Sequence, residues 1–451
     1  MAIIAPFKAL TYDFARFGDI SLLMAPPYDI ISEEEQDEFY RTHPRNIVRL
    51  ILGKKKRGDS DWDNRYTRAV DYLARWETED VLVRSKTPCM YMTSLTYKPE
   101  DGGAPRVRWG LIVLVRIEDE DSGIVLPHEK TFSAHKDDRL QLMRACRAQL
   151  SQIFALYEDP ENKVFNYFKP YTSSDPLISF DFKDGTHHQM WAIRDESVFK
   201  KVAQAMREKS IFIADGHHRY ETSRNFRNIM RTRYGTRPSG RSYEYVMMYL
   251  SNLDDKGLTI LPSHRLIKKY PDFQLELFLE KLKRRFEITT LSFTGSNQAA
   301  DSQEFRHKLE EKGRLNSAIG FHLQGHPNSY LLTLKPGARE EMGANLHPAL
   351  KELDVLVLSR LILQDTCGFT TEDMDDESQF HYESDFMKAI ARVESGDYKI
   401  AFLLNPTKID HVKEVASRAL IMPRKSTYFY PKVLTGLVFN KIDADEIIQL
   451  P

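Results

Sequence analysis

Length constrains the possible folds of this chain more than any local motif does. A single hydrophobic core stops growing at about 250 to 300 residues, and the chain has 451 residues, so at least two domains are expected. Hydrophobic residues make up 41% of the chain and charged residues 29%, a mixture that favours packed cores over disorder. Lys and Arg total 64 against 65 Asp and Glu, so the overall charge shows no sign of nucleic-acid binding and no nucleic-acid partner is expected.

Helical and strand-like segments are mixed along the chain, which predicts an α+β fold. Apolar residues at three-and-four spacing predict helices, and short runs rich in β-branched residues predict strands. The pattern changes after Ile267, so we predict a mixed-sheet domain over residues 1–268 and a second α/β domain over residues 269–451. Strands are expected at 90–96, 109–117, 210–214, 243–253, 258–261, 288–293, 318–323, 329–334 and 399–404, and helices at 61–79, 196–209, 219–233, 273–286, 346–363, 385–393 and 408–420.

Cysteine usage and the opening residues bear on the cellular compartment. Cys89, Cys146 and Cys367 lie far apart, with neither disulfide-framework nor zinc-ligand spacing, so we expect them to be structural in a reducing compartment. The first residues lack a basic region, and Pro6 and Lys8 break their apolar stretch. No run of about 18 apolar residues occurs. A cytoplasmic protein without a membrane partner is the expectation.

The densest local motif spans residues 211–221, where an apolar run meets a glycine turn and a predicted helix. Backbone N–H groups and the dipole at a helix start favour an anion, and Gly216 lets the backbone approach it closely. His218 and Arg219 add directional donors for phosphate oxygens. One alternative is a simple capped turn in which Asp215 accepts from helix N–H groups. Another is a zinc site, but adjacent histidines lack the four-residue spacing of helical zinc motifs, and no metal ligand is assigned.

Further polar motifs follow predicted strands or rigid loops. In Leu126-Pro127-His128-Glu129-Lys130-Thr131, Glu129 is a candidate general base, although a solvated loop fits equally well. Prolines in Leu261-Pro262-Ser263-His264-Arg265 and in Ala25-Pro26-Pro27-Tyr28-Asp29 would hold the polar residues in place. Taken alone, each of these two motifs fits a structural loop slightly better than a site. Residues 422–432 are basic and aromatic, which fits RNA stacking less well than a strand whose aromatic rings fill a core.

The order and spacing of these motifs resemble a bacterial and archaeal family catalogued as the conserved domain of unknown function number 1015. The resemblance covers nearly the whole chain. Its segments are residues 26–32, 127–131, 138–140, 214–221, 261–265 and 422–432.

Within that match, residues 216–221 are similar to the nucleotide-phosphate turn of the ParB and sulfiredoxin superfamily, whose free serine kinases carry a similar Asp-Gly-His-His-Arg string. His217 stands where sulfiredoxin has its reactive cysteine, which disfavours sulfinic acid reduction and favours the kinase branch. The resemblance implies a ParB/sulfiredoxin-like N-terminal domain and ATP or ADP phosphates on the turn. It also implies a divalent metal such as Mg²⁺ and an acidic base near a substrate hydroxyl.

The resulting hypothesis is a small-molecule kinase that transfers phosphate from ATP or ADP to a hydroxyl metabolite, most simply free L-serine to give O-phosphoserine. Two alternatives remain open, namely a ParB-like nucleotide-binding regulatory module and a metal-dependent phosphohydrolase. Arg219→Ala is expected to remove phosphate affinity while leaving the fold intact. The predicted site comprises catalytic Glu129, Asp215 and His217, phosphate-binding Gly216, His218 and Arg219, and substrate-binding Asp29, His128, Lys130, Thr131, His264 and Arg265.

Overall fold

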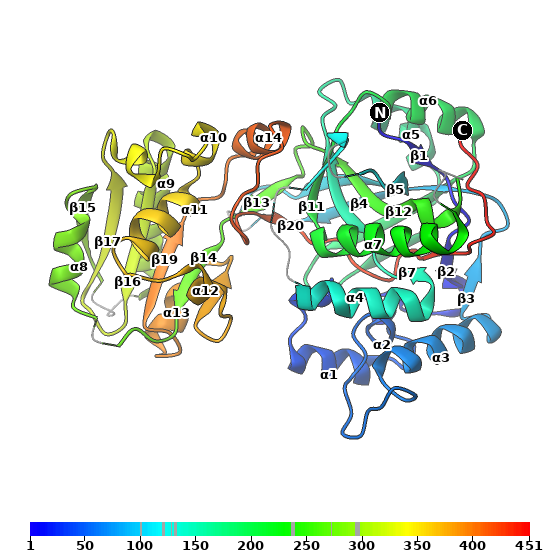
Figure 1. Ribbon diagram of the computed structural model, residues 1–451, viewed down its shortest axis with the longest axis horizontal. Helices are drawn as coiled ribbons and strands as arrows, with labels where there is room; N and C mark the ends of the chain where they lie inside the picture. Colours follow the sequence, from blue (N-terminus) through cyan, green and yellow to red (C-terminus); the bar gives the residue numbers. More distant parts are fainter. Residues whose placement is uncertain are drawn as a thin grey trace. The chain divides into compact units, whose positions relative to one another are not determined.

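The computed structural model describes residues 1–99, 102–119, 122–127, 129, 133–235, 240–271, 273–293 and 298–451, except the side chains of residues 133–135. These residues form a mixed α/β structure that divides into two compact units (Figure 1). The first unit contains Met1–Pro127, Thr131–Thr259 and Pro431–Pro451, and the second contains His128–Lys130 and Ile260–Tyr430. The second unit is therefore mainly one inserted segment. Compared with the predicted boundary at 268/269, it begins at Ile260 and ends at Tyr430, so the last residues of the chain belong to the first unit.

The first unit is built on a large mixed sheet with the strand order β6-β11-β8-β12-β5-β4-β10-β9, in which β1 also pairs with β5. The pairs β6–β11 and β8–β12 are parallel, and the other neighbours are antiparallel. The predicted hairpin of β4 and β5 is confirmed. The strands are β1 (Ile4–Ala5), β4 (Met90–Tyr97), β5 (Arg106–Arg116), β6 (Val125–Leu126), β8 (Ile153–Tyr157), β9 (Ile178–Asp181), β10 (His187–Ile193), β11 (Ile211–Asp215) and β12 (Tyr245–Asn252).

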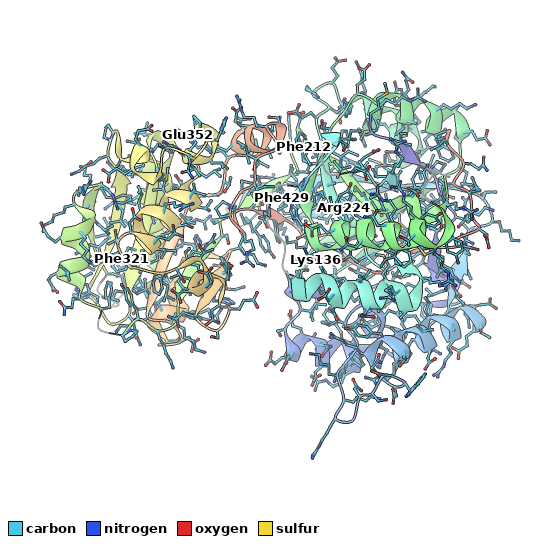
Figure 2. The ribbon with its side chains drawn as sticks, viewed as in Figure 1. Lys136, Phe212, Arg224, Phe321, Glu352 and Phe429 are labelled. Carbon is cyan, nitrogen blue, oxygen red and sulfur yellow. The ribbon has the colours of Figure 1, made fainter. Side chains whose placement is uncertain are left out.

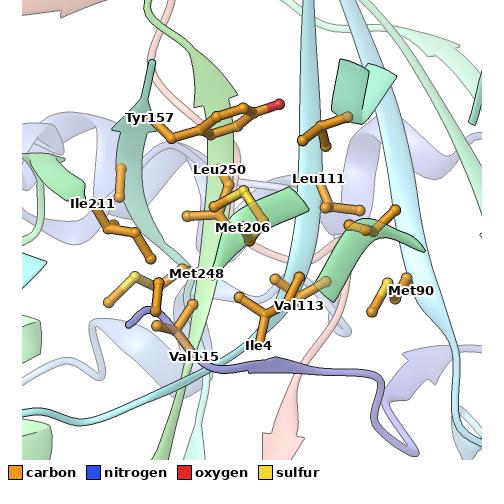
Figure 3. Close-up of a cluster of buried hydrophobic side chains, with 14 of the residues drawn as sticks. Ile4, Met90, Leu111, Val113, Val115, Tyr157, Met206, Ile211, Met248 and Leu250 are labelled. Atoms are coloured by element: carbon orange, nitrogen blue, oxygen red, sulfur yellow. The ribbon is translucent and has the colours of Figure 1, made fainter. Parts of the chain in front are cut away.

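One face of this sheet carries the main core of the first unit (Figure 3). Alternate residues of a strand point to the same face, and accordingly Val113 and Val115 of β5 and Met248 and Leu250 of β12 enter one buried cluster. Helices α5 (Lys163–Phe168) and α6 (Glu196–Met206) add their apolar sides to that cluster, for example Met206. This packing confirms the helix predicted from the apolar spacing after residue 196.

The remaining elements of the first unit include the helix pair that positions the predicted turn. Helices α4 and α7 lie side by side (Figure 1). Strand β21 pairs with β7, which anchors the C-terminal segment in this unit. The elements are α1 (Glu33–Thr42), α2 (Val48–Ile51), α3 (Arg65–Thr78), α4 (Ser133–Cys146), α7 (His217–Tyr234), β2 (Leu10–Tyr12), β3 (Leu82–Arg84), β7 (Ala148–Gln149) and β21 (Asn440–Lys441).

The second unit contains an antiparallel sheet with the order β15-β17-β16-β19-β14-β18. A separate pair joins β13 (Thr259–Leu261) to β20 (Tyr428–Tyr430), so the aromatic part of residues 422–432 is a strand, with Phe429 buried. The sheet strands are β14 (His264–Ile267), β15 (Phe286–Ser292), β16 (Ala318–Leu323), β17 (Asn328–Leu334), β18 (Phe380–Glu383) and β19 (Ile400–Leu404), and the helices include α8 (Leu275–Leu282), α9 (Gln298–Leu315), α12 (Thr371–Asp375), α13 (Phe386–Glu394) and α14 (Ile409–Ser417).

The helix predicted over residues 346–363 is interrupted, and the prediction of one continuous helix is wrong. The segment divides into α10 (Pro348–Lys351), α11 (Asp354–Val357) and a π-helix over Leu358–Gln364. Leu361, Ile362 and Leu363 are all buried, and three consecutive buried residues exceed what one α-helical face presents. In the part of the chain that the structure describes, no helix is long and apolar enough to cross a membrane.

Candidate functional site

The predicted phosphate turn is a sharp junction between β11 and α7. Asp215 ends the strand, Gly216 adopts a left-handed conformation with φ +95°, and the helix begins at His217. A Cβ atom at Gly216 would lie 2.8 Å from Nε of Arg219, whose side chain folds back over the turn. Both the backbone conformation and this close approach therefore require glycine.

Asp215 is held between two cations. Nζ of Lys432 donates to Oδ1 at 2.7 Å, and a terminal nitrogen of Arg219 donates to Oδ2. The Asp215 side chain is only 13% exposed. Burial alone raises the pKa of Asp215, but Lys432 and Arg219 outweigh burial and hold this pKa well below its usual range. The carboxylate is therefore ionised at neutral pH and is a poor proton acceptor.

Arg219 is anchored within the protein by its two terminal nitrogens. Besides its contact with Asp215, its other terminal nitrogen donates to the carbonyl of Gln152, and the side chain is 10% exposed. These two bonds use two of the five N–H donors of the guanidinium, so the predicted contact of Arg219 with a phosphate stays a prediction. Arg219 orients the turn and contributes positive charge to it.

Gly216→Ala is expected to disrupt the turn. An L-residue in the left-handed region costs roughly 1–2 kcal/mol, and the new methyl group would displace the Arg219 side chain. The variant should unfold at lower urea concentration than the wild type, which a urea titration will show. As a control, Gly18→Ala introduces a methyl group that meets nothing within 4 Å and should leave the midpoint unchanged. Equal midpoints for the wild type and Gly216→Ala would contradict the geometry.

The motif at residues 25–29 belongs to the first unit, as the turn does. The guanidinium carbon of Arg139 lies 4.0 Å from the ring centroid of Tyr28. Burial and Asp29 raise the pKa of Tyr28 to about 12, while Arg139 and Arg219 oppose the rise, which places the phenol within electrostatic range of the turn. Asp29 follows Tyr28 in a 3-10 helix (Tyr28–Ile30) and is exposed.

Positive groups from both helices of the α4–α7 pair lie near the start of α7. Lys136 of α4 forms a 2.8 Å ion pair with Glu221, one turn into α7. Figure 2 shows Lys136 and Arg224 on the two neighbouring helices. Arg219 and Lys432 thus contact the junction itself, whereas Lys136 pairs with Glu221 further along α7.

The motif at residues 126–131 begins at the end of β6. Because β6 pairs with β11 in parallel and Leu126 lies opposite Phe212, the chain leaves the sheet there at the same edge as the turn. His128, Lys130 and Thr131 lie outside the described residues. Glu129 is described; it belongs to the second unit, forms a bridge with Met422 and is half-buried.

His264 is a core residue of the second unit. Its side chain is 0% exposed, and Nδ1 accepts a 3.0 Å hydrogen bond from the Leu404 N–H. Burial lowers the pKa of His264 to about 3, with Arg265 adding to the effect, so the ring is neutral. We therefore correct the prediction that His264 binds substrate and assign it to the packing of the β14–β19 pair. A four-residue, fully buried strand shows no alternation that could have revealed this in the sequence.

Arg265 is also buried, but its environment is polar and pre-oriented. Its guanidinium donates to Ser263 Oγ at 2.8 Å and to the Lys425 carbonyl at 3.0 Å, and it stacks 4.5 Å from the Tyr382 ring centroid. Burial lowers the pKa of Arg265, whereas Tyr382 and Glu129 raise it. Glu129 and Arg265 therefore interact within the second unit. Parts of the three motifs at residues 126–131, 261–265 and 422–432 thus meet there.

The first-unit site also contains residues to which the sequence analysis gave no site role. Lys432 and Gln152 bind the turn, and Arg108 anchors the neighbouring Pro431 carbonyl with a 2.6 Å hydrogen bond. The Arg108 guanidinium is fully buried and lies 4.6 Å from the ring centroid of Phe154, which pairs with Asp215 across β8 and β11. These partners are separated by 67 to 323 residues, so no local pattern signals them.

Thiol and metal chemistry receive little support from the described residues. Cys89 and Cys146 are buried and Cys367 is half-buried. Burial raises the pKa of Cys146 and of Cys367 to about 12, which disfavours the reactive thiolate. Across the described ranges, no group of three or more His, Cys, Asp or Glu side chains could hold a metal ion.

A family model described as "Protein of unknown function (DUF1015)" matches residues 4–356. The chain therefore belongs to this family. No curated protein matches the chain.

Among solved structures, a free serine kinase in complex with AMP is similar at 13% sequence identity, covering 75% of this chain and 93% of that chain, with a TM-score of 0.36. A conserved hypothetical protein from Pyrococcus furiosus is 14% identical, with 70% and 90% of the two chains covered and a TM-score of 0.34. A C-terminally truncated SbnI from Staphylococcus aureus is 11% identical, with 75% and 87% covered and a TM-score of 0.32.

Proposed function

We propose that the protein is a small-molecule kinase that transfers phosphate from ATP or ADP to a hydroxyl group, most simply that of free L-serine. The junction of β11 and α7 would bind the nucleotide phosphates. The first unit would then be a ParB/sulfiredoxin-like nucleotide-binding domain, as the motif resemblance implies.

The observation that carries this proposal is the charged glycine junction at Asp215 and Gly216. An 18-residue helix starts there, and its first N–H groups lack intrahelical acceptors, so their dipoles attract an anion. Two cations, Arg219 and Lys432, contact the carboxylate of Asp215, so positive charge lies beside the start of the helix. Backbone N–H groups and the half-buried His218 would contact the phosphate oxygens, and the absence of a side chain at Gly216 would permit close approach.

The electrostatics separate the roles of the two candidate carboxylates. Asp215, with its pKa held low by Lys432 and Arg219 despite burial, would organise the turn together with the buried His217. Glu129, in the second unit, would then be the base toward the acceptor hydroxyl, with Arg265 as its cationic neighbour. Asp29, His128, Lys130 and Thr131 remain candidates for contacting the acceptor.

Mg²⁺ would enter with the nucleotide. This ion keeps several waters and is held mainly by phosphate oxygens with one or two carboxylates, so it needs no dedicated cage of side chains. When bound, the ion would neutralise charge that develops on the transferred phosphoryl group.

The direct test incubates purified protein and Mg²⁺ with ATP or ADP and a panel of acceptors that includes L-serine, glycerol and ethanolamine. Phosphorus NMR then follows the products. The expected result is O-phosphoserine that forms only when nucleotide and acceptor are both present. Nucleotide hydrolysis at the same rate with and without an acceptor would favour the phosphohydrolase. Nucleotide binding without turnover would favour the regulatory module.

Glu129→Gln is expected to lower kcat at least about 100-fold, since a positioned general base contributes typically 10²–10⁴-fold. Nucleotide affinity should stay unchanged, because the amide keeps the size of the side chain and the turn is not altered. Glu208→Gln, which changes an exposed glutamate, is the matched control and should behave as the wild type. A folded Glu129→Gln protein with full turnover would remove Glu129 from the catalytic set.

A further inference from the structure

The second unit contains a cavity of about 360 Å³, and among its lining residues only Arg265 takes part in a functional assignment above. We call it the arginine cavity, because Arg265, Arg360 and Arg424 line it. All of its lining residues lie between Arg265 and Arg424 and belong to the second unit. The volume falls within the range of roughly 300–1,000 Å³ that is typical of small-molecule sites.

Positive charge predominates on the cavity wall. Asp375 is the only carboxylate among the lining residues, and it forms an ion pair with Arg424. Arg265 is buried and fixed by Ser263, Lys425 and the Tyr382 ring. A guanidinium held in this way loses little rotational freedom when it binds a ligand.

Arg360 supplies a cation that is free to bind. It is exposed, and it forms no ion pair with any residue that the structure describes. It lies in the π-helix over Leu358–Gln364, which also contributes Ser359, Leu363 and Gln364 to the wall. Single π turns occur frequently at functional sites, and here the turn brings an arginine and polar side chains to one cavity.

The rest of the wall is apolar. Leu346, Leu350, Leu363, Met374 and Ile421 line the cavity from four different segments. Methionine and leucine side chains adapt to ligands of different shapes. The cavity therefore combines an apolar surface with a cationic one, which suits a ligand that has both characters.

We propose that the arginine cavity binds a small organic anion with an apolar body, whose carboxylate or phosphate group contacts Arg360 and Arg265. Guanidinium groups recognise both of these groups through charge-assisted hydrogen bonds. Of the three cavity arginines, only Arg265 also has a part in the proposed kinase function, as the neighbour of Glu129, and the test below relies on Arg360, so this inference does not depend on that function.

The test uses the full chain and four ligands with the same eight-carbon body, namely octanoate, octyl phosphate, octan-1-ol and octylamine, in isothermal titration calorimetry. The anions are expected to bind at least about ten-fold more tightly than octan-1-ol, which corresponds to one charge-assisted contact. Octylamine should not bind. The tighter of the two anions identifies the head group that the cavity prefers.

Variants then locate the site. Arg360→Gln should weaken anion binding about ten-fold or more, whereas Arg314→Gln, an exposed arginine of α9 in the same unit, should not. Leu346→Glu, at a half-buried apolar wall position, should abolish anion binding with an unchanged melting curve. Failure of both anions to bind the wild type, equal affinity for octylamine, or equal losses in Arg360→Gln and Arg314→Gln would overturn the proposal. None of these outcomes bears on whether the protein phosphorylates serine.

Discussion

Replacing Arg219 with alanine is expected to lower the free energy of unfolding by about 3–5 kcal/mol, the typical cost of breaking a buried ion pair by removing one partner. The physical reason is that Asp215 would keep its charge in a nearly buried position with only Lys432 as a partner. The Gln152 carbonyl would also lose its donor. Urea unfolding followed by circular dichroism measures the change.

A double-mutant cycle provides the control. Asp215→Asn removes the charge that Arg219 neutralises, so the double variant Asp215→Asn, Arg219→Ala should be less destabilised than the sum of the single variants. Arg219→Lys should recover only part of the stability, because an ammonium group cannot donate to Asp215 and Gln152 with the same planar geometry. A cost below about 1 kcal/mol for Arg219→Ala would show that Lys432 alone satisfies Asp215.

This expectation replaces the one drawn from the sequence, in which Arg219→Ala removed phosphate affinity and left the fold intact. The nucleotide affinity of the Arg219→Ala variant therefore has to be measured under conditions in which this variant is still folded. Nucleotide titrations at low urea and low temperature, compared with those of Gly18→Ala, separate a lost contact from a disordered turn.

The second large effect is expected at Arg108. Arg108→Ala should lower the free energy of unfolding by about 2–5 kcal/mol, as for other large-to-small changes at fully buried positions. It empties the space beside Phe154 and Tyr249 and removes the donor to Pro431. Limited proteolysis should then cleave the C-terminal segment faster than in the wild type.

Arg108→Met is expected to behave differently. Nε and one terminal nitrogen of Arg108 have no hydrogen-bond partner among the described residues, and replacing a buried charge with an apolar side chain of similar volume is often neutral or stabilising. Unfolding stability should therefore stay within about 1 kcal/mol of the wild type or rise. Equal destabilisation by Arg108→Met and Arg108→Ala would show that the charge itself, through Pro431 and the aromatic rings, holds this region together.

The sequence predicted those elements whose signal is local. Residues 61–79 and 385–393 carry a helical apolar period, and α3 and α13 form there. The junction at Gly216 was predicted because a strand, a glycine and a helix follow one another within a few residues. Each of these predictions rests on interactions between neighbours in the chain.

The parts that could not be predicted depend on distant partners or on burial from all sides. Lys432 reaches Asp215 across 217 residues, and its basic, aromatic neighbourhood predicted a strand rather than a partner for the turn. The hydrogen bond from Arg219 to the Gln152 carbonyl joins residues 67 positions apart, so no local pattern signals it. His264 resembled a site residue because its motif lacks the periodicity that would mark it as buried.

The insertion of the second unit before Pro431 has a consequence for the newly made protein. Asp215 leaves the ribosome 217 residues before Lys432, an interval of roughly 10–40 s at about 5–20 residues per second. During that time the nascent turn has Arg219 but lacks its second cation, and β7 lacks the partner strand β21. Final closure of the first unit therefore waits until the second has been translated, so nascent chains stalled within the second unit should not yet contain the complete cluster around Asp215.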